Sequence, residues 1–503
     1  MGYAIKIVLF FIFLGASFNK SINDTGQKNL MKSLYRRVSD RDFSFIEKCS
    51  ESKDVYIECF NIDIEPDDWQ KIVHFRETGA NNTTLPITEE MQEKVNALFT
   101  YNNEIYKVKL GLTGYMFSHI KHPYKWSFSI NVKEGKTIMG MKKFALLVPE
   151  PRGYLTDWVA TEMLKANNVI GLRTDIINLT VNGKDHGVFY LEERYDKMLI
   201  ENNGLSGGII FKLLDNEFKI YGLKKILKNK EQSEQLVKLK QLIHAFLNNE
   251  IDPENIFDLK KFASLFVVSD IMNQVHAIFR SNLRFYFNPK SGLIEPIGRE
   301  WGYLRKLTQT ETELLIGRPK KKYNRALHND QIIKKLINSY ALKEEYIKQA
   351  EILSKNEYLD SILDHKSVKF NVLMKRIYKE QPFYLFPKEI MHENQNFIRD
   401  KLHPQSSLMD VFYVRIKTDS IVLKAYNKID LPIEIYYLTF GKKNKILPKE
   451  RIVVKSKYNS PGMETLSFLL NTDFTSLDSV IEKLELHYGI LGTNDMKSSI
   501  IFP

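Results

Sequence analysis

The chain is poor in cysteine, with only Cys49 and Cys59 among its 503 residues. Two cysteines cannot complete a four-ligand zinc site, and no zinc-finger spacing occurs. If the protein is exported, the two thiols are expected to form one disulfide, and the alternative is two separate buried thiols. A Walker A motif, the aromatic signature of RNA-binding domains and internal repeats are also absent from the sequence. The sequence therefore offers no zinc-finger or P-loop chemistry.

Long apolar runs are scarce as well. One run, residues 7–18, follows Lys6 and is too short to span a bilayer comfortably. It is typical of a secretory signal, with Gly15, Ala16 and Ser17 where cleavage would occur. We interpret residues 1–18 as a signal peptide or N-terminal anchor and expect an exported protein (secreted, periplasmic or cell-surface), or one held at a membrane by this segment. A buried first helix is the alternative. No lipobox cysteine follows, so a lipoprotein is not expected.

Acidic residues are outnumbered, with 61 Asp and Glu against 73 Lys and Arg, a net charge of +12. A basic balance suits nucleic acid, an anionic membrane or nucleotide phosphates. The lysines are scattered, and the densest run is PKKKY from Pro319. Scattered lysines indicate a solvated surface, so nucleic-acid binding is not expected. With 43% hydrophobic and 27% charged residues, the chain should form globular cores.

The pattern along the chain predicts an α+β protein of two or three domains. After a tether at 19–50, residues 51–223 are rich in strands. Asn102-Asn103 and Asn182-Gly183 mark hairpin turns there, and Pro66 opens a helix. Residues 224–404 are helical, with helices expected at 232–248, 258–272, 328–355, 358–379 and 388–402. Residues 303–323 form a basic, irregular segment between these helices. Short strands fill 405–503 and predict a β-sandwich-like accessory domain with a structural or adhesive role.

One stretch, residues 269–302, carries residue types suited to metal and phosphoryl chemistry. Asp270 is expected near the end of a buried helix, Asn282 before a strand, and Glu300 just past the return strand. A hairpin there would bring Asn282 and Glu300 close together. Carboxylate and amide oxygens suit Mg²⁺ or Mn²⁺, and a further carboxylate can orient an attacking hydroxyl. Solvated or helix-capping acids are the alternative.

Two features of residues 51–223 bear on phosphate binding. The loop 114–125 ends in Lys125 and is of the type that covers phosphates, although a plain surface turn is the alternative. Glu193 ends a hairpin strand, where it could pair with such a lysine. From the residues alone we expect an exposed strand end instead.

From about residue 56 to about residue 358, the order of motifs resembles the CotH (spore coat protein H) kinase-like family of atypical protein kinases. The resemblance is carried by these segments: YIECFNIDIEPDDW from Tyr56, YKVKLGLTG from Tyr106, KWSF from Lys125, VNGKDHGVFYLEE from Val181, GGIIFK from Gly207, NLRFYFNP from Asn282 and IEPIG from Ile294.

The resemblance implies a two-lobed, kinase-like fold, with an N-lobe at 51–223 and a C-lobe at 224–404. It also implies transfer of the ATP γ-phosphoryl group to a Ser or Thr hydroxyl of a protein substrate, with Mg²⁺ or Mn²⁺. By the same resemblance, Asp270 takes the position of the catalytic acid, and Asn282 and Glu300 are metal ligands. The nucleotide contacts implied are Lys125 at the phosphates, Glu193 as organiser of the N-lobe site, Lys212 as a weaker candidate, and Arg152 at a phosphate or in a surface ion pair.

The sequence departs from the family pattern at Glu300, where Asp is usual, and at Gly298, which is often acidic. Glu is one methylene longer, which displaces a small ion that demands octahedral geometry. Weak, Mn²⁺-preferring or absent activity would follow. The alternative function is a catalytically inactive CotH-like structural or interaction protein of the surface or envelope.

Overall fold

The computed structural model describes residues 57–81, 91, 93–114, 116–214, 217–278, 282–302, 304–308, 331–417, 420–440, 444–457, 462–469 and 484–502. The predicted signal peptide, the tether, Cys49 and most of the basic segment 303–323 lie outside this part of the chain. Two compact units emerge. Unit 1 comprises Met1–Val159, Leu172–Leu205 and Leu363–Pro387, and unit 2 comprises Ala160–Gly171, Ser206–Ile362 and Lys388–Pro503.

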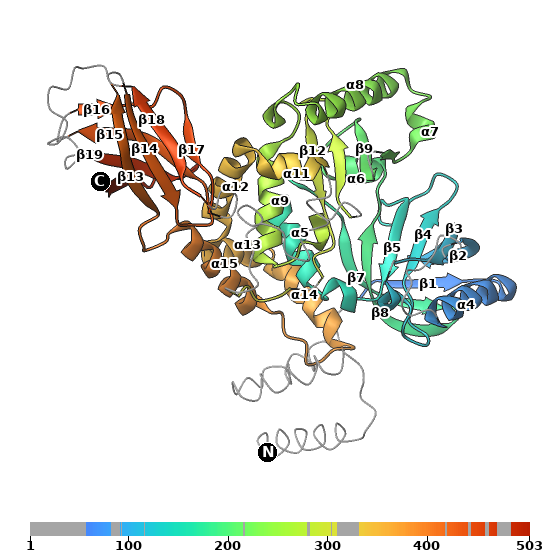
Figure 1. Ribbon diagram of the computed structural model, residues 1–503. Helices are drawn as coiled ribbons and strands as arrows, with labels where there is room; N and C mark the ends of the chain where they lie inside the picture. The colour runs from blue at the N-terminus through green and yellow to red at the C-terminus, as the bar shows by residue number, and fades with distance from the viewer. Residues whose placement is uncertain are drawn as a thin grey trace, which may run out of the picture. The chain divides into compact units, whose positions relative to one another are not determined.

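Unit 1 is built on a closed β-barrel with the strand order β1-β2-β3-β4-β5-β8-β7 (Figure 1). Neighbouring strands are antiparallel except β1 and β7, which pair in parallel. The strands are β1 (Cys59–Asp63), β2 (Val95–Tyr101), β3 (Glu104–Leu112), β4 (Phe128–Val132), β5 (Lys143–Leu147), β7 (Thr174–Val181) and β8 (Lys184–Glu193). Alternate side chains fill the interior, and Phe60, Phe99 and Phe144 contact one another there through their rings.

The predicted hairpin turns of the barrel are confirmed. Asn102 and Asn103 have φ of 50° and 62°, and Asn182 and Gly183 have φ of 49° and 74°. Positive φ at both central residues is the geometry that twists with the flanking strands, and Asn and Gly tolerate it best. The helix expected at Pro66 is α4 (Pro66–Asn81). Between β3 and Ile209 the structure also describes the helices η3 (Phe117–His119), η4 (Glu150–Arg152), α5 (Thr156–Ala166) and α6 (Lys197–Asn202).

Two helices predicted as continuous are each broken in two. Residues 328–355 contain α11 (Gln331–Asn338) and α12 (Tyr340–Leu353), and residues 358–379 contain parts of α13 (Asn356–His365) and α14 (Ser367–Tyr378). Ser339 explains the first break, because its Oγ accepts the Leu342 N–H at 3.2 Å and so caps α12. Lys366 lies at the second break with φ −105° and ψ 11° and caps α14 without a side-chain hydrogen bond.

Unit 2 contains a mixed sheet with the order β10-β9-β11-β12-β6. Its strands are β6 (Ile170–Gly171), β9 (Ile209–Leu214), β10 (Glu217–Ile220), β11 (Arg284–Phe287) and β12 (Ile294–Gly298). The further helical elements are α7 (Leu223–Ile226), α8 (Lys230–Leu247), η5 (Pro253–Asn255), α9 (Leu259–Ile271), η6 (His276–Ile278) and α15 (Lys388–Leu402). Helix α9 is apolar on nearly all sides, and it is buried against α12, α15 and β12.

The C-terminal strands form two antiparallel sheets, so the expected β-rich region and the α+β class are confirmed. One sheet is β13 (Met409–Lys417), β14 (Ser420–Asn427) and β18 (Glu464–Leu469). The other is β15 (Ile433–Phe440), β16 (Asn444–Ile446), β17 (Ile452–Val454), β19 (Leu484–Ile490) and β20 (Lys497–Ile500). A bridge between Phe412 and Phe502 joins the chain that follows β20 to β13 of the first sheet.

The structure bears on the predictions about membrane-spanning helices and about the cysteine thiols. Among the described residues, no helix has the length and apolar character needed to cross a bilayer. Cys59 carries a free, exposed thiol that donates to the Ile57 carbonyl at 3.4 Å, so the expectation of a buried thiol is wrong for this residue.

Candidate functional site

The hairpin β11–β12 brings two of the predicted site residues together. Asn282 lies two residues before β11 and Glu300 two residues after β12, and the strands pair from Arg284 opposite Ile297. The Asn282 amide Nδ2 donates to the backbone oxygen of His276 at 2.9 Å. The His276 ring Nδ1 lies 3.3 Å from Glu300 Oε2. Asn282 and Glu300 therefore flank His276 at the open end of the hairpin, as the sequence predicted for the pair.

The turn of this hairpin follows from its sequence. The Asn288 side chain accepts the Lys290 N–H at 3.0 Å, and Gly292 has φ of 75°, a conformation that favours glycine. Asn288 also donates through Nδ2 to Glu295 at 2.7 Å, a bond between two buried side chains. The register of the hairpin, and with it the meeting of its two ends, is thus fixed locally.

Glu300 is held in an unusual conformation. Its φ is 69°, in the left-handed region that non-glycine residues seldom adopt. One carboxylate oxygen is paired with the neighbouring Arg299, which is almost fully buried, and the other faces His276. The carboxylate therefore has a cationic partner on one side and a titratable ring on the other.

His276 and Arg299 are site residues that the sequence interpretation missed. Both lie within residues 269–302, where the sequence prediction named only carboxylate and amide side chains. The signal available was an imidazole six residues before Asn282 and a guanidinium next to Glu300. His276 is the more accessible of the two, with a side chain 51% exposed.

The glycine at the often-acidic position has a steric explanation. Gly298 is the last residue of β12, and a Cβ placed there would collide with Cδ1 of Leu164. Leu164 is itself fully buried. An acidic side chain at this position would therefore require the buried Leu164 side chain to shift, so the local packing favours glycine.

Asp270 lies in the last turn of α9, near the end of a buried helix as predicted, and is 3% exposed. Its Oδ2 accepts a hydrogen bond from the hydroxyl of Tyr346 on α12. Burial, and next the Asp270 carboxylate, raise the pKa of Tyr346 well above its usual value, so the phenol stays a donor. Asn394 fixes the chain after α9 by donating to the Ile271 carbonyl at 2.7 Å and the Arg305 carbonyl at 2.8 Å.

Lys125 has a carboxylate partner far along the chain within unit 1. Its Nζ lies 2.6 Å from Glu380 Oε2, and Glu380 also accepts the Val188 N–H at 2.5 Å. Burial lowers the pKa of Lys125, and Glu380 opposes that shift. A Cβ at Gly187 would collide with Glu380 Oε1, so the absence of a side chain at Gly187 leaves room for the carboxylate. Gly187 also has φ of 78°, a conformation that favours glycine.

Glu193 corrects the expectation of an exposed strand end. It is 1% exposed, and its Oε2 accepts from the Arg173 Nε at 3.0 Å. Its partner is therefore an arginine and not a lysine. Arg173 is fixed in turn by donating to the Met139 carbonyl and the Gly140 carbonyl, both at 3.1 Å.

The last two predicted nucleotide contacts belong to different units. Arg152 forms an ion pair with Glu192, 2.8 Å from Nε to Oε2, but both residues are buried, so the expected surface location is wrong. Lys212 lies on β9 opposite Lys219 of β10. Lys125, Arg152 and Glu193 belong to unit 1, whereas Lys212, Asp270, Asn282 and Glu300 belong to unit 2.

The hairpin end can supply hard oxygen ligands. Since Asn282 uses Nδ2 toward His276, its Oδ1 is directed away from that bond, and Glu300 adds a carboxylate. Within the described ranges, no group of three or more His, Cys, Asp or Glu is arranged to hold a metal ion. Mg²⁺ commonly keeps several waters and takes one or two protein ligands plus substrate phosphates. The donors therefore fit such an ion, provided that it replaces Arg299 and His276 as the partner of Glu300.

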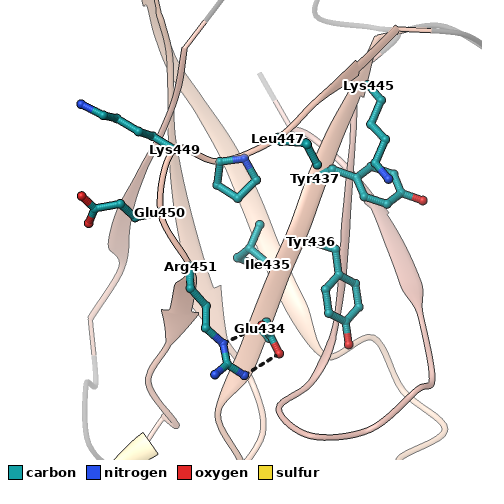
Figure 2. A pocket seen from close by; sticks show the side chains of 10 residues that line it. Glu434, Ile435, Tyr436, Tyr437, Lys445, Leu447, Lys449, Glu450 and Arg451 are labelled. Atoms are coloured by element: carbon teal, nitrogen blue, oxygen red, sulfur yellow. Dashed lines mark hydrogen bonds and ion pairs between the residues drawn. The ribbon is translucent and has the colours of Figure 1, made fainter.

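A pocket of about 420 Å³ lies elsewhere in unit 2, along β15 (Figure 2). Tyr436, Lys445 and Arg451 are among its lining residues. Figure 2 shows Arg451 pairing with Glu434, and the Nε–Oε1 distance is 2.7 Å. None of the predicted site residues lines this pocket, so it is separate from the candidate site.

Comparison with known proteins agrees with the motif order. The family model described as CotH kinase protein matches residues 118–404, more than half of the chain. The matched range contains every predicted site residue, from Lys125 to Glu300. No curated protein matches the chain. The chain belongs to the CotH kinase protein family.

Proposed function

We propose that this protein is an exported atypical kinase that transfers the γ-phosphoryl group of ATP to a Ser or Thr hydroxyl of a protein substrate. The observation that carries the proposal is the convergence of Asn282 and Glu300 on His276 at the end of β11–β12. Phosphoryl transfer needs positioning and charge neutralisation more than covalent help from the protein. Oxygen ligands at a fixed hairpin end meet the first of these needs.

Each residue of the candidate site has a proposed role. Asn282 Oδ1 and the Glu300 carboxylate would hold a Mg²⁺ or Mn²⁺ ion, which when bound neutralises charge on the phosphates. Arg299, once Glu300 turns to the ion, supplies a guanidinium for phosphate oxygens. His276 positions Asn282 through its backbone oxygen. Asp270 would orient the acceptor hydroxyl, while Tyr346 fixes its Oδ2.

ATP with Mn²⁺ should raise the thermal stability of the purified chain, and Glu300→Ala should abolish that rise. A ligand that binds only the folded state contributes about 2.7 kcal/mol at a hundredfold excess over Kd. The matched control is Glu393→Ala, since Glu393 is also a carboxylate paired with a cation, Lys306, and is 48% exposed. Scanning calorimetry with ATP alone, Mn²⁺ alone and both checks the expectation. An equal rise in the Glu300→Ala variant would place the nucleotide elsewhere.

A second function is favoured by a specific observation. Both oxygens of Glu300 already have partners, Arg299 and His276, and Leu164 packing keeps Gly298 without a side chain. These features suit a CotH-family interaction protein that no longer transfers phosphate. In that case neither Mn²⁺ nor Mg²⁺ changes the stability of the chain in the presence of ATP.

A further inference from the structure

The outer face of the barrel carries a row of polar and cationic side chains. Lys109, Asn131 and Lys143 are aligned across β3, β4 and β5. Arg194 extends this row, because its backbone N–H donates to the Lys143 carbonyl at 3.0 Å. The neighbouring positions Val108, Ile130 and Phe144 belong to the core. Since side chains alternate along a strand, the row lies on the outside of the barrel.

Lys94 lies against this row. Its Nζ donates to Ser129 Oγ at 2.9 Å and to Asn131 Oδ1 at 3.0 Å. Gly111 and Ala145 are the cross-strand neighbours of Ser129, and neither has a side chain beyond Cβ. An ammonium group carries three donors, and both of these acceptors are neutral.

The charges around Lys94 leave an excess of positive charge. Burial, and next the positive charges of Arg194, Lys143 and Lys133, lower the pKa of Lys94 to about 8. Glu192, the buried carboxylate opposite Ala145 in the neighbouring strand, is already held by Arg152 and Arg194, each at 2.8 Å. In the described part of the chain, the acceptors bonded to Lys94 Nζ are both neutral. Partly buried charge with neutral partners is costly, so an anion that neutralised Lys94 would bind favourably here.

We propose that Lys94, Ser129 and Asn131, flanked by Lys143 and Arg194, form a phosphate-binding site on the outer face of the barrel. The third N–H of Lys94 points to the ligand. Ser129 Oγ accepts from Lys94 and therefore has its own O–H to donate, and Asn131 presents Nδ2 because Oδ1 is turned to Lys94. Lys94 lies before the residues matched by the family model. The site does not rest on the proposed kinase activity.

Isothermal titration of the full chain with inorganic pyrophosphate, in metal-free buffer of fixed ionic strength, tests the site. We expect wild-type protein to bind, and Lys94→Met to bind at least about tenfold more weakly, a loss of about 1.4 kcal/mol. Lys107→Met is the matched control, since it removes the same charge from an exposed lysine on β3 that is paired with Glu134. It should bind within about twofold of wild type.

The melting temperature of Lys94→Met shows whether its weaker binding comes from a folding defect. A lysine whose folded pKa lies below its unfolded value destabilises the protein at pH 7, and that penalty is relieved as the pH rises from about 8 to about 10.5. Lys94→Met should therefore melt at or above the wild-type temperature at pH 7. At pH 8, binding to wild type should take up protons, because the anion favours charged Lys94, and binding to Lys94→Met should not.

The titration repeated with ATP identifies the source of the phosphate. If ATP binds more tightly than pyrophosphate, the natural ligand is a nucleotide. If the two bind equally, it is a simple phosphate compound. Either result supports the site. The proposed site is overturned if neither pyrophosphate nor ATP binds, or if Lys94→Met and Lys107→Met lose equal affinity. Those results would leave the Glu300→Ala experiment unaffected, since that experiment concerns metal-dependent binding at the hairpin.

Discussion

Replacing Asp270 by asparagine should lower the rate of phosphate incorporation by about 10²- to 10⁴-fold, the usual contribution of a positioned acid or base. Asparagine keeps the shape of the side chain and an oxygen to accept the Tyr346 hydroxyl, so the end of α9 stays intact. What it loses is the carboxylate that orients the acceptor hydroxyl. The measurement is the initial rate of phosphate transfer from ATP to a generic protein acceptor, with Mn²⁺ present.

Tyr346→Phe separates this role from a purely structural one. It removes the hydrogen bond to Asp270 but leaves the carboxylate in place. If Asp270 orients the acceptor, Tyr346→Phe keeps most of the activity while Asp270→Asn does not. Equal losses in both variants would show that Asp270 serves only to hold α9 and α12 together, and full activity of Asp270→Asn would remove it from the mechanism.

Asp175→Ala should lower the free energy of unfolding by about 3 kcal/mol, because removing one partner of a buried ion pair leaves the other charge uncompensated. Asp175 on β7 accepts from the Arg376 Nη1 at 2.6 Å and from the Lys369 Nζ at 2.8 Å, both from α14. Arg376 is buried and also donates to the Ile176 carbonyl at 3.0 Å. Urea unfolding, read from the shift in midpoint at constant m-value, checks the expectation.

Two controls accompany the Asp175 variant. Lys369→Met removes the exposed arm of the cluster, 43% exposed, and should cost less than about 1 kcal/mol. Combining Asp175→Leu with Arg376→Met removes both buried charges and should recover most of the lost stability. If Asp175→Ala unfolds at the wild-type midpoint, α14 is held in place by its apolar contacts, such as Phe370 with Trp158 of α5, and not by this ion pair.

The features that sequence predicted well are those encoded within a few residues. The Asn102-Asn103 and Asn182-Gly183 turns and the start of α4 at Pro66 each depend on local backbone preferences. The pairing of β11 with β12 follows from such a turn and from alternating residues. For this reason the meeting of Asn282 and Glu300 at the end of the hairpin could be predicted.

The features that sequence did not predict depend on partners distant in the chain. Lys125 and Glu380 are 255 residues apart, and no local pattern links them. The sequence predicts Glu193 at an exposed strand end, because its partner Arg173 lies 20 residues earlier in the chain. The helix break at Ser339 was missed because apolar spacing continues across it, so periodicity outweighed a single capping residue. The burial of Arg152 against Glu192 likewise required the folded barrel.

The most direct test of the central claim is covalent transfer itself. Purified protein, from about residue 19 onward, is incubated with ATP and Mn²⁺ in the presence of a generic protein acceptor, and phosphoserine and phosphothreonine are counted by mass spectrometry. The account predicts phosphate on the acceptor or on the chain itself, dependent on the metal and lost in Glu300→Ala. Absence of phosphate with both Mn²⁺ and Mg²⁺, from protein that is folded and melts cooperatively, would contradict it and establish the inactive CotH-family alternative.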